Sequence, residues 1–473
     1  MKVQVLLPKI FNFPFTYNAD NNKKYKKGDL VQIPFGNKKE LGVIWNDIAY
    51  TPKKITIKNI DKKVINFALN QTLIDFIDWF AMYNMVPRGL ALKMCIGNGK
   101  NLYKDTDEDE TQKKTEIINY SLNKEQKTTL KFLENNAKKF CVSVLQGTTG
   151  SGKTFVYFER IKKIIDSGKQ ALVLLPEIFL TNQFQARFEN FFGYTPAIWH
   201  SKISPKRKRI IFKGLVHNKI KLLVGARSSL MLPFKKLGII IVDEEHDVSY
   251  KQDEGVTYNA RDMAIARASF EDIPIDLVSS IPSIETYNNI QTKKYKHANI
   301  SKRYNNYPLP ETKIINLNFK KIKNQYISDE TVIEVNKFLN KGDQVLFFIN
   351  RRGFAPFLIC KKCGYKHICN NCSLYLTFHK LKNKAICHHC GFESDLIKTC
   401  KIKQNCEFTM YGPGVEKIFE ETKKIFPNKN ISIFSSDFMK KKNETELLFK
   451  KIDEKKIDIL IGTQMISKGF NFP

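Results

Sequence analysis

The stretch Leu145-Gln-Gly-Thr-Thr-Gly-Ser-Gly-Lys-Thr154 decides the fold, because it places a glycine-rich loop between a short apolar run and a segment that can continue as a helix. The loop matches the pattern G-x-x-x-x-G-K-[S/T], in which backbone N–H groups approach phosphate oxygens. In this pattern the lysine reaches the β- and γ-phosphates and the last hydroxyl holds Mg²⁺. The predicted nucleotide ligands are therefore Gly147, Thr148, Thr149, Gly150, Ser151, Gly152, Lys153 and Thr154.

An acidic strand end follows about ninety residues later, in Ile239-Ile-Ile-Val-Asp-Glu-Glu-His246. We expect Asp243 to bind the Mg²⁺ shell and Glu244 to orient or deprotonate an attacking water. Either motif alone would be a weak signal, since glycine-rich turns and solvated acidic strand ends are both common. Their order, spacing and shared strand context predict a site of nucleoside triphosphate hydrolysis, with Lys153, Asp243 and Glu244 as its catalytic residues.

The composition favours an anionic partner. The chain has 473 residues and a formal charge of +31, and nucleic acid is the commonest partner of such a basic protein. Lysine, asparagine and isoleucine are abundant throughout, so compositional drift is an alternative source of much of this charge. The first ten residues lack the apolar region of a signal peptide, and no apolar run of about eighteen residues occurs. We expect a soluble, cytoplasmic protein without a membrane partner.

The cysteines predict zinc. Eight of the ten lie between Cys360 and Cys406, and three pairs have the Cys-x-x-Cys spacing at which two thiolates share one tetrahedral ion. The simplest nesting gives two closed, structural Cys₄ sites and therefore two Zn²⁺ ions. A nearby histidine, His367, His379, His388 or His389, could replace a thiolate, most plausibly in the outer site. The inner site comprises Cys369, Cys372, Cys387 and Cys390, and the outer site Cys360, Cys363, Cys400 and Cys406.

Patterns along the chain predict a multidomain protein. Apolar runs with turn signals indicate a small β domain over 1–65. Apolar residues at helical spacing, followed by polar and acidic residues, indicate a helical segment and a linker over 66–120. Alternating strands and helices predict a parallel α/β lobe over 121–300 and a second α/β lobe over 326–473, with the zinc-binding insertion at 360–406. The predicted strands span 140–145, 171–175, 221–224, 239–242, 275–279, 344–349, 431–434 and 457–461.

Taken in order, these motifs resemble the PriA family, the primosomal proteins N′, which are superfamily 2 DNA helicases of bacterial replication restart. The resemblance covers nearly the whole chain. It includes the Walker B sequence Asp243-Glu-Glu-His246, an aromatic-rich loop around Tyr250 and Tyr258, and the double zinc insertion. Further matches are motif Ia at 175–181, motif Ib at 225–229, motif III at 278–285, motif IV at 349–354 and motif V at 461–469.

The resemblance implies two RecA-like lobes that move 3′→5′ along single-stranded DNA with ATP and Mg²⁺ as cofactors. It implies a helicase that recognises stalled or abandoned forks, remodels them and initiates primosome assembly. The implied partners are forked and single-stranded DNA, the 3′ end of a nascent strand, primosome and helicase-loader proteins, and single-stranded DNA-binding protein.

The resemblance also suggests roles for individual residues. Phe15, Tyr17 and Gly36 resemble the pocket that grips the 3′ end. Arg227 is expected to contact the DNA backbone, with a surface salt bridge as the alternative. Tyr250 and Tyr258 are expected to stack on bases, with ordinary packing as the alternative. Gln126 is expected to hydrogen-bond adenine.

Four departures limit what carries over. Ile281 stands where motif III has threonine, and Lys403 stands where the last zinc knuckle would place its second sulfur. About twenty acidic, polar residues stand where the family carries a winged helix, and the sequence ends at Pro473, before motif VI. The chain therefore resembles a family member that is truncated at its C-terminus and whose second lobe is incomplete. ATP hydrolysis by such a chain is in doubt. A non-enzymatic fork-binding scaffold and a general superfamily 2 DNA or RNA helicase remain alternative functions.

Overall fold

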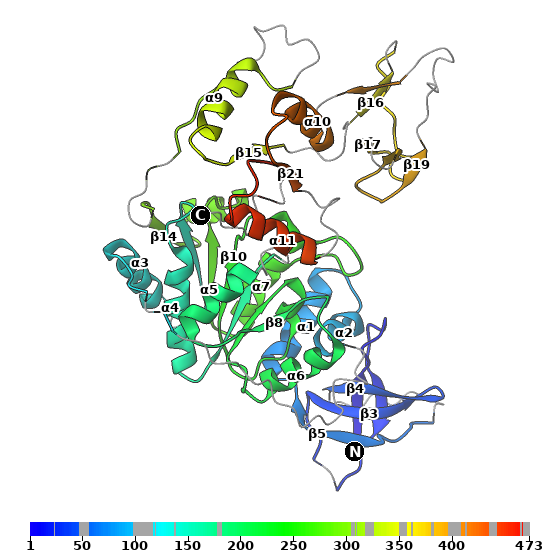
Figure 1. The fold of residues 1–473 in the computed structure, drawn as a ribbon. Helices are drawn as coiled ribbons and strands as arrows, with labels where there is room; N and C mark the ends of the chain where they lie inside the picture. The colour runs from blue at the N-terminus through cyan, green and yellow to red at the C-terminus, as the bar shows by residue number, and fades with distance from the viewer. Residues whose placement is uncertain are drawn as a thin grey trace. The chain divides into compact units, whose positions relative to one another are not determined.

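The computed structural model describes most of the chain, and it divides into two compact units, Met1–Leu309 and Pro310–Pro473 (Figure 1). Each unit is described here by itself. The acidic linker at 98–116, residues 177–181 of motif Ia, residues 350–354 of motif IV and most of motif V lie outside the described residues. The described residues are 1–22, 24–46, 56–97, 117–118, 120–136, 139–176, 182–303, 308, 310–316, 326–349, 357–360, 363–379, 383–395, 408–411, 414–434, 442–463 and 466.

The first unit begins with a five-stranded antiparallel sheet of order β2-β1-β4-β3-β5. Alternate residues of its strands, among them Val3, Val5, Val31 and Ile33, point into one apolar core, as the period of two along a strand requires. The predicted small N-terminal β domain is confirmed. Its strands are β1 Lys2–Leu6, β2 Phe15–Asn18, β3 Asp29–Phe35, β4 Lys38–Asn46 and β5 Lys62–Ala68.

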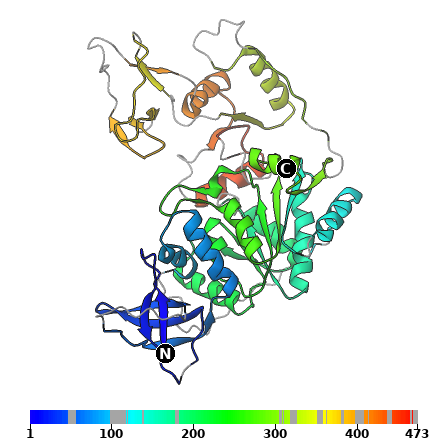
Figure 2. The same cartoon turned by 180° about the vertical axis from the view of Figure 1, so that it is seen from behind.

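Two helices, α1 Gln71–Tyr83 and α2 Arg88–Ile96, connect this sheet to the rest of the unit (Figure 2). The Asn70 side chain caps α1 by accepting a hydrogen bond from the Leu73 N–H, and Pro87 is the N-cap residue of α2. The buried face of α1 packs against α7 Ala260–Phe270. The two domains therefore share one hydrophobic cluster.

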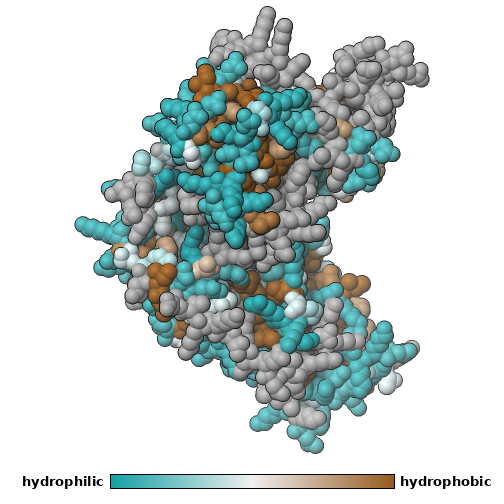
Figure 3. Space-filling view, viewed as in Figure 1, coloured by the Kyte–Doolittle hydropathy of each residue, from teal (hydrophilic) through white to brown (hydrophobic). Residues whose placement is uncertain are grey.

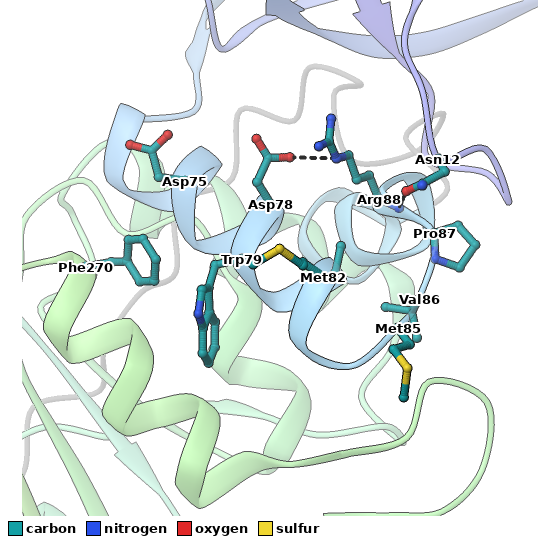
Figure 4. A pocket seen from close by; sticks show the side chains of 11 residues that line it. Asn12, Asp75, Asp78, Trp79, Met82, Met85, Val86, Pro87, Arg88 and Phe270 are labelled. Atoms are coloured by element: carbon teal, nitrogen blue, oxygen red, sulfur yellow. Dashed lines mark hydrogen bonds and ion pairs between the residues drawn. The ribbon is translucent and has the colours of Figure 1, made fainter.

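A hollow of about 670 Å³ lies where α1, α2 and α7 meet (Figure 4). The rings of Trp79 and Phe270 lie on its wall with centroids 6.0 Å apart. The Asp78 carboxylate accepts a hydrogen bond from the Trp45 indole N–H at 3.0 Å, and it pairs with Arg88 at 3.3 Å. These polar contacts fix the two helices against strand β4.

The centre of the first unit is a seven-stranded parallel sheet of order β14-β6-β13-β10-β7-β9-β8. Strand β10 is apolar on both faces, because Ile239 and Ile241 pack into one cluster while Ile240 and Val242 pack into the other. Five strands confirm the prediction: β6 Cys141–Gly147, β7 Gln170–Leu174, β9 Leu222–Gly225, β10 Leu237–Asp243 and β13 Pro274–Ser279.

Two further strands, β8 Ala197–Trp199 and β14 Lys296–Ile300, form the edges of this sheet and were not predicted. Helices cover both faces, as in doubly wound α/β lobes. The remaining elements of the unit are α3 Lys124–Asn135, α4 Lys153–Asp166, α5 Asn182–Phe192, α6 Pro205–Val216, η2 Arg227–Met231, η3 Val248–Tyr250, β11 Lys251–Gln252, β12 Tyr258–Asn259 and α8 Ile284–Gln291.

A buried ion pair joins α4 to β13. Arg160 donates to both carboxylate oxygens of Asp276, at 2.6 and 2.8 Å, and the two side chains are 3% and 0% exposed. We expect Asp276→Ala to lower the free energy of unfolding by about 3–5 kcal/mol, because it leaves a buried guanidinium unpaired. Urea unfolding would measure this loss. The double variant Arg160→Met/Asp276→Leu is the control, and a loss as large in the double variant would contradict the explanation.

The second unit contains a three-stranded parallel sheet of order β15-β22-β21. Alternate residues of β22 face opposite sides, so Ile459 and Ile461 pack under α9 and α10, whereas Leu460 packs with α11. The predicted second α/β lobe is confirmed. Its elements are α9 Asp329–Leu339, β15 Val345–Phe348, α10 Val415–Ile425, β21 Ile431–Phe434, α11 Lys442–Asp453 and β22 Ile459–Gly462.

The cysteine-rich insertion lies between β15 and α10 as two small antiparallel sheets. One pairs β16 Phe357–Cys360 with β20 Phe408–Tyr411, and the other has three strands, β17 Thr377–His379, β18 Lys384–Ile386 and β19 Glu393–Asp395. Its apolar core includes Cys369, Leu376, Phe378 and Cys387. The five core residues that the structure describes in this cluster are few for such a subdomain, and folds of this size usually need a metal or other cross-link.

Hydrophilic residues cover much of the face seen in Figure 3, with scattered hydrophobic patches between them. Among the helices that the structure describes, none is long and apolar enough to cross a membrane.

Candidate functional site

The predicted phosphate-binding loop connects the carboxyl end of β6 to the first turn of α4. Gly150 and Gly152 have φ values of 81° and 79°, which residues other than glycine rarely adopt. A Cβ atom at Gly152 would also lie 2.4 Å from Nε2 of Gln126. The loop conformation therefore requires these glycines, and it brings all eight predicted ligands to one helix N-terminus.

Gln126 is 1% exposed and braces the loop. Its Nε2 donates to the Ser151 carbonyl at 2.9 Å, while its Oε1 accepts from the backbone N–H of Asn123 at 2.9 Å. Asn123 and Gln126 form a capping box at the start of α3, a signal visible in the sequence as Asn-x-x-Gln. The structure thus gives Gln126 a supporting role, and adenine recognition stays a prediction.

The loop suits phosphate oxygens. Within the described part of the chain, the Thr148 and Ser151 hydroxyls are buried without a hydrogen-bond partner. The Lys153 ammonium donates to the carbonyls of Gly147 and Thr148 at 2.7 and 3.3 Å, so it lies over the loop. Burial lowers the pKa of Lys153, while Asp243 and Glu244 oppose that shift. Unpaired donors and a cation at a helix N-terminus fit a nucleoside triphosphate with its Mg²⁺.

The predicted carboxylates lie at the end of β10. Tyr157 donates its hydroxyl to Asp243 Oδ2 at 2.8 Å, and the Glu244 N–H donates to Oδ1 at 3.0 Å. Because Tyr157 belongs to α4, this contact joins the phosphate-loop helix to the Asp243 carboxylate. Burial raises the pKa of Asp243. Burial and the neighbouring Asp243 carboxylate raise the pKa of Glu244 to about 7, a value suited to a general base.

The raised pKa of Glu244 predicts a pH dependence of stability. Between its ordinary value of 4.5 and about 7, the folded chain keeps a proton that the unfolded chain has lost. The free energy of unfolding should therefore fall as pH rises through this range. Glu244→Gln should reduce the fall, as measured by urea unfolding in Mg²⁺-free buffer at about pH 5 and about pH 8. An undiminished fall in the variant would show that other groups cause it.

Glu245, Arg261 and Ser283 were missed by the sequence reasoning. The Glu245 carboxylate is fully buried beside Arg261 and accepts a hydrogen bond from the Ser283 backbone N–H at 2.7 Å. Next to it, His246 Nδ1 lies 2.8 Å from the Ser279 hydroxyl. The residues are far apart in sequence, so no local pattern could pair them; the third carboxylate of Asp-Glu-Glu-His was the only available signal.

The aromatic-rich loop is packed into the first unit. Tyr250 is 1% exposed, and its hydroxyl donates to the carbonyls of Leu174 and Asp243 at 2.9 and 2.6 Å. Tyr258 is 3% exposed and packs edge-on against Phe80 of α1. Arg227 is half-buried at the start of η2 and donates to the Lys251 carbonyl at 2.6 Å. DNA contacts by these three residues stay predictions, and the packing role is the one observed for both tyrosines.

The predicted 3′-end residues lie together at one end of the N-terminal sheet. Tyr17 donates its hydroxyl to the Pro34 carbonyl at 3.1 Å, and the Phe15 ring packs against Phe35 with centroids 5.3 Å apart. Gly36 follows in the β3–β4 turn with φ 59°. An aromatic surface beside a tight turn suits stacking against a terminal base.

The inner cysteines form a metal site. The sulfur atoms of Cys369, Cys372, Cys387 and Cys390 all lie within 4.8 Å of one another, and two of the pairs are 3.4 and 3.5 Å apart. Four thiolates around a tetrahedral Zn²⁺ would be about 3.8 Å apart, as Zn–S bonds of about 2.3 Å require. The donor set therefore fits one structural Zn²⁺ with no open coordination position.

The outer site is only partly described. Cys360 ends β16, and the Cys363 backbone N–H approaches Cys360 Sγ at 3.4 Å, as in a knuckle turn. Cys400 and Cys406 lie outside the described residues. Of the candidate histidines, His379 and His388 contact each other through Nε2 atoms at 2.9 Å, and His379 Nδ1 lies 3.7 Å from Glu416 of α10.

A phosphate-loop site with paired carboxylates on a parallel sheet defines a P-loop NTPase. Residues 123–279 match the DEAD/DEAH box helicase family. Residues 2–97 match the family described as the PriA 3′ DNA-binding domain, and residues 369–394 match the Cys-rich region domain of PriA DNA helicase.

The chain belongs to the family of replication restart protein PriA. It is 39% identical to that protein from Rickettsia felis over 478 residues, covering 99% of this chain and 72% of the relative. Identity to the Bacillus subtilis protein is 35% over 379 residues, which is 79% of this chain and 47% of that relative. Among solved structures, RecG bound to a three-way DNA junction matches with a TM-score of 0.43 at 16% identity, covering 75% of this chain and 38% of that one.

Proposed function

We propose that the chain uses ATP hydrolysis to move 3′→5′ along DNA at replication forks, after its N-terminal domain has bound the 3′ end of a nascent strand. The observation that carries this proposal is the presence of both sites in one compact unit. The unit joins an ATPase site with a 3′ DNA-binding domain through the shared core of α1 and α7. A general helicase does not require this combination.

In the ATPase site, Lys153 neutralises charge on the β- and γ-phosphates of ATP, and Thr154 and Asp243 are the residues that would hold Mg²⁺. Glu244 lies next to Asp243 and accepts a proton from water when it is ionised, which its pKa of about 7 allows near neutral pH. When bound there, the ion would supply positive charge that offsets the charge developing on the phosphates.

In the N-terminal domain, the ring of Phe15 offers a face to the terminal base, and Gly36 lets the strand approach the backbone closely. Arg227 is the proposed contact to the DNA backbone. We further propose a second Zn²⁺ held by Cys360, Cys363, Cys400 and Cys406. Primosome proteins, a helicase loader and single-stranded DNA-binding protein are the proposed protein partners.

A strand-release assay on labelled forks tests the proposal. Release should require ATP and Mg²⁺, and binding should be tighter to a fork with a 3′ end at the junction than to one whose 3′ end is blocked. ATP hydrolysis stimulated equally by RNA would favour a general superfamily 2 helicase. Tight fork binding without stimulated hydrolysis would favour a scaffold.

A further inference from the structure

Three residues of the ATPase lobe form a buried polar cluster around the third carboxylate of the Walker B sequence. Glu245 Oε1 accepts from the Ser283 N–H at 2.7 Å. Oε2 accepts from the Thr286 hydroxyl at 3.0 Å, the Ser283 hydroxyl at 3.1 Å and Arg261 at 3.3 Å. The Glu245 side chain is 0% exposed and that of Arg261 is 10% exposed. We refer to Glu245, Arg261, Ser283 and Thr286 as the Glu245 cluster.

The cluster joins three segments that are separate in sequence. Glu245 follows the catalytic carboxylates at the end of β10, and its backbone N–H donates to the Val278 carbonyl at 3.1 Å. Ser283 is the N-cap of α8, and Arg261 lies in the first turn of α7. A carboxylate at a helix N-terminus is stabilised by the unpaired N–H groups there. Glu245 therefore fixes the start of α8 to the end of the catalytic strand.

The motif III segment between β13 and α8 is held by polar contacts at both of its ends. Ser279 contacts His246 at one end, and Ser283 contacts Glu245 at the other. Ile281, between them, carries no polar group and is 75% exposed. The threonine of the family pattern is thus absent here, and the polar contacts to this segment come from Glu245, from His246 and from Arg261, which donates to the Ser283 hydroxyl at 2.6 Å.

We propose that Glu245 is a positioning residue that couples nucleotide binding at Asp243 and Glu244 to the position of motif III and α8. Displacing the Glu245 carboxylate alone would leave it and its buried donors unpaired, which costs far more than moving both segments together. A shift at the end of β10 on nucleotide binding therefore carries the start of α8 with it. Arg261 extends the same connection to α7, against which helix α1 packs.

The test measures coupling between two ligands without hydrolysis, although it rests on the proposed function for its choice of ligands. The affinity for single-stranded DNA is measured by fluorescence anisotropy with and without a non-hydrolysable ATP analogue and Mg²⁺. We expect the analogue to change the affinity of the wild-type chain by about fivefold or more. In Glu245→Gln, which keeps the shape but loses the charge, the change should fall below about twofold. Affinity for the analogue alone should stay within about threefold, because the described contacts of the Glu245 side chain are with Arg261, Ser283 and Thr286, outside the phosphate loop.

Thr286→Val and Gln170→Leu complete the design. Thr286→Val removes one hydrogen bond to Glu245 with little change of shape, and it should give an intermediate coupling even if Glu245→Gln fails to fold. Gln170 is a fully buried polar residue at the start of β7, where it donates to the Leu215 and Ile220 carbonyls. Its variant should lose stability but keep the coupling.

Three results would overturn the proposal. The first is full coupling in a folded Glu245→Gln or in Thr286→Val. The second is an equal loss of coupling in Gln170→Leu, which would indicate general destabilisation. The third is a wild-type chain whose DNA affinity does not respond to the analogue. Failure of the proposed function shows separately, as absence of strand release in the fork assay.

Discussion

Replacing Lys153 by alanine is expected to reduce ATP hydrolysis by roughly 10³-fold or more, because it removes the cation that offsets phosphate charge in the transition state. The affinity for forked DNA without nucleotide should change little, since the Lys153 ammonium donates to two carbonyls of its own loop and faces the carboxylates of the ATPase site. Initial rates of phosphate release and fork binding by anisotropy would measure the two effects.

Lys162→Ala provides the matched control for this prediction. Lys162 lies on the same helix, α4, but its side chain is exposed. The control variant should keep both hydrolysis and fork binding. A loss of nucleotide-free DNA affinity in Lys153→Ala that Lys162→Ala does not show would mean that Lys153 contributes to the DNA site.

Much of the ATPase site could be predicted from the sequence, because its chemistry depends on short, contiguous patterns. The glycine spacing of the phosphate loop and the acidic end of an apolar strand are each local, and the structure places both at the carboxyl end of the same sheet. The Glu245–Arg261 contact was not predictable. It joins the segment that follows strand β10 to the first turn of helix α7, and only the tertiary fold brings those two segments together.

Cys372→Ser is expected to remove about one zinc ion per chain and to unfold the three-stranded part of the insertion. The physical reason is that the core there is small, while structural zinc contributes on the order of 10 kcal/mol to such folds. Zinc content by atomic absorption and protection of the insertion from proteolysis would measure the loss. Mild chelation of the unmodified chain should leave one ion, held in the inner site.

Two other cysteine variants serve as comparisons. Cys141→Ser changes a cysteine of β6 outside the insertion, so zinc content should not change. Cys406→Ser should damage the insertion less than Cys372→Ser, since each inner cysteine belongs to a regular Cys-x-x-Cys pair. Equal damage from both variants, or an inner site that empties first, would contradict the proposed nesting.

The fold was predicted best where strands are buried on both faces. Strands such as β7 and β10 read as continuous apolar runs, whereas the edge strand β14, Lys-His-Ala-Asn-Ile, is largely polar and carries no such pattern. The packing of Tyr250 and Tyr258 was left open for a related reason. An aromatic residue in a polar segment suits either a base or a core, and only the contacts with Asp243 and Phe80 distinguish them.

The helix pair α1 and α2 has a further consequence for how the first unit folds. Its core extends without a break from Leu6 of the N-terminal sheet through Phe76 of α1 to Ile240 of β10. The Thr72 hydroxyl also donates to Glu271 at the end of α7. Neither domain can lose its structure without exposing apolar surface of the other, so the N-terminal β domain and the ATPase lobe should melt in a single cooperative transition. A substitution that loosens either domain lowers the stability of both.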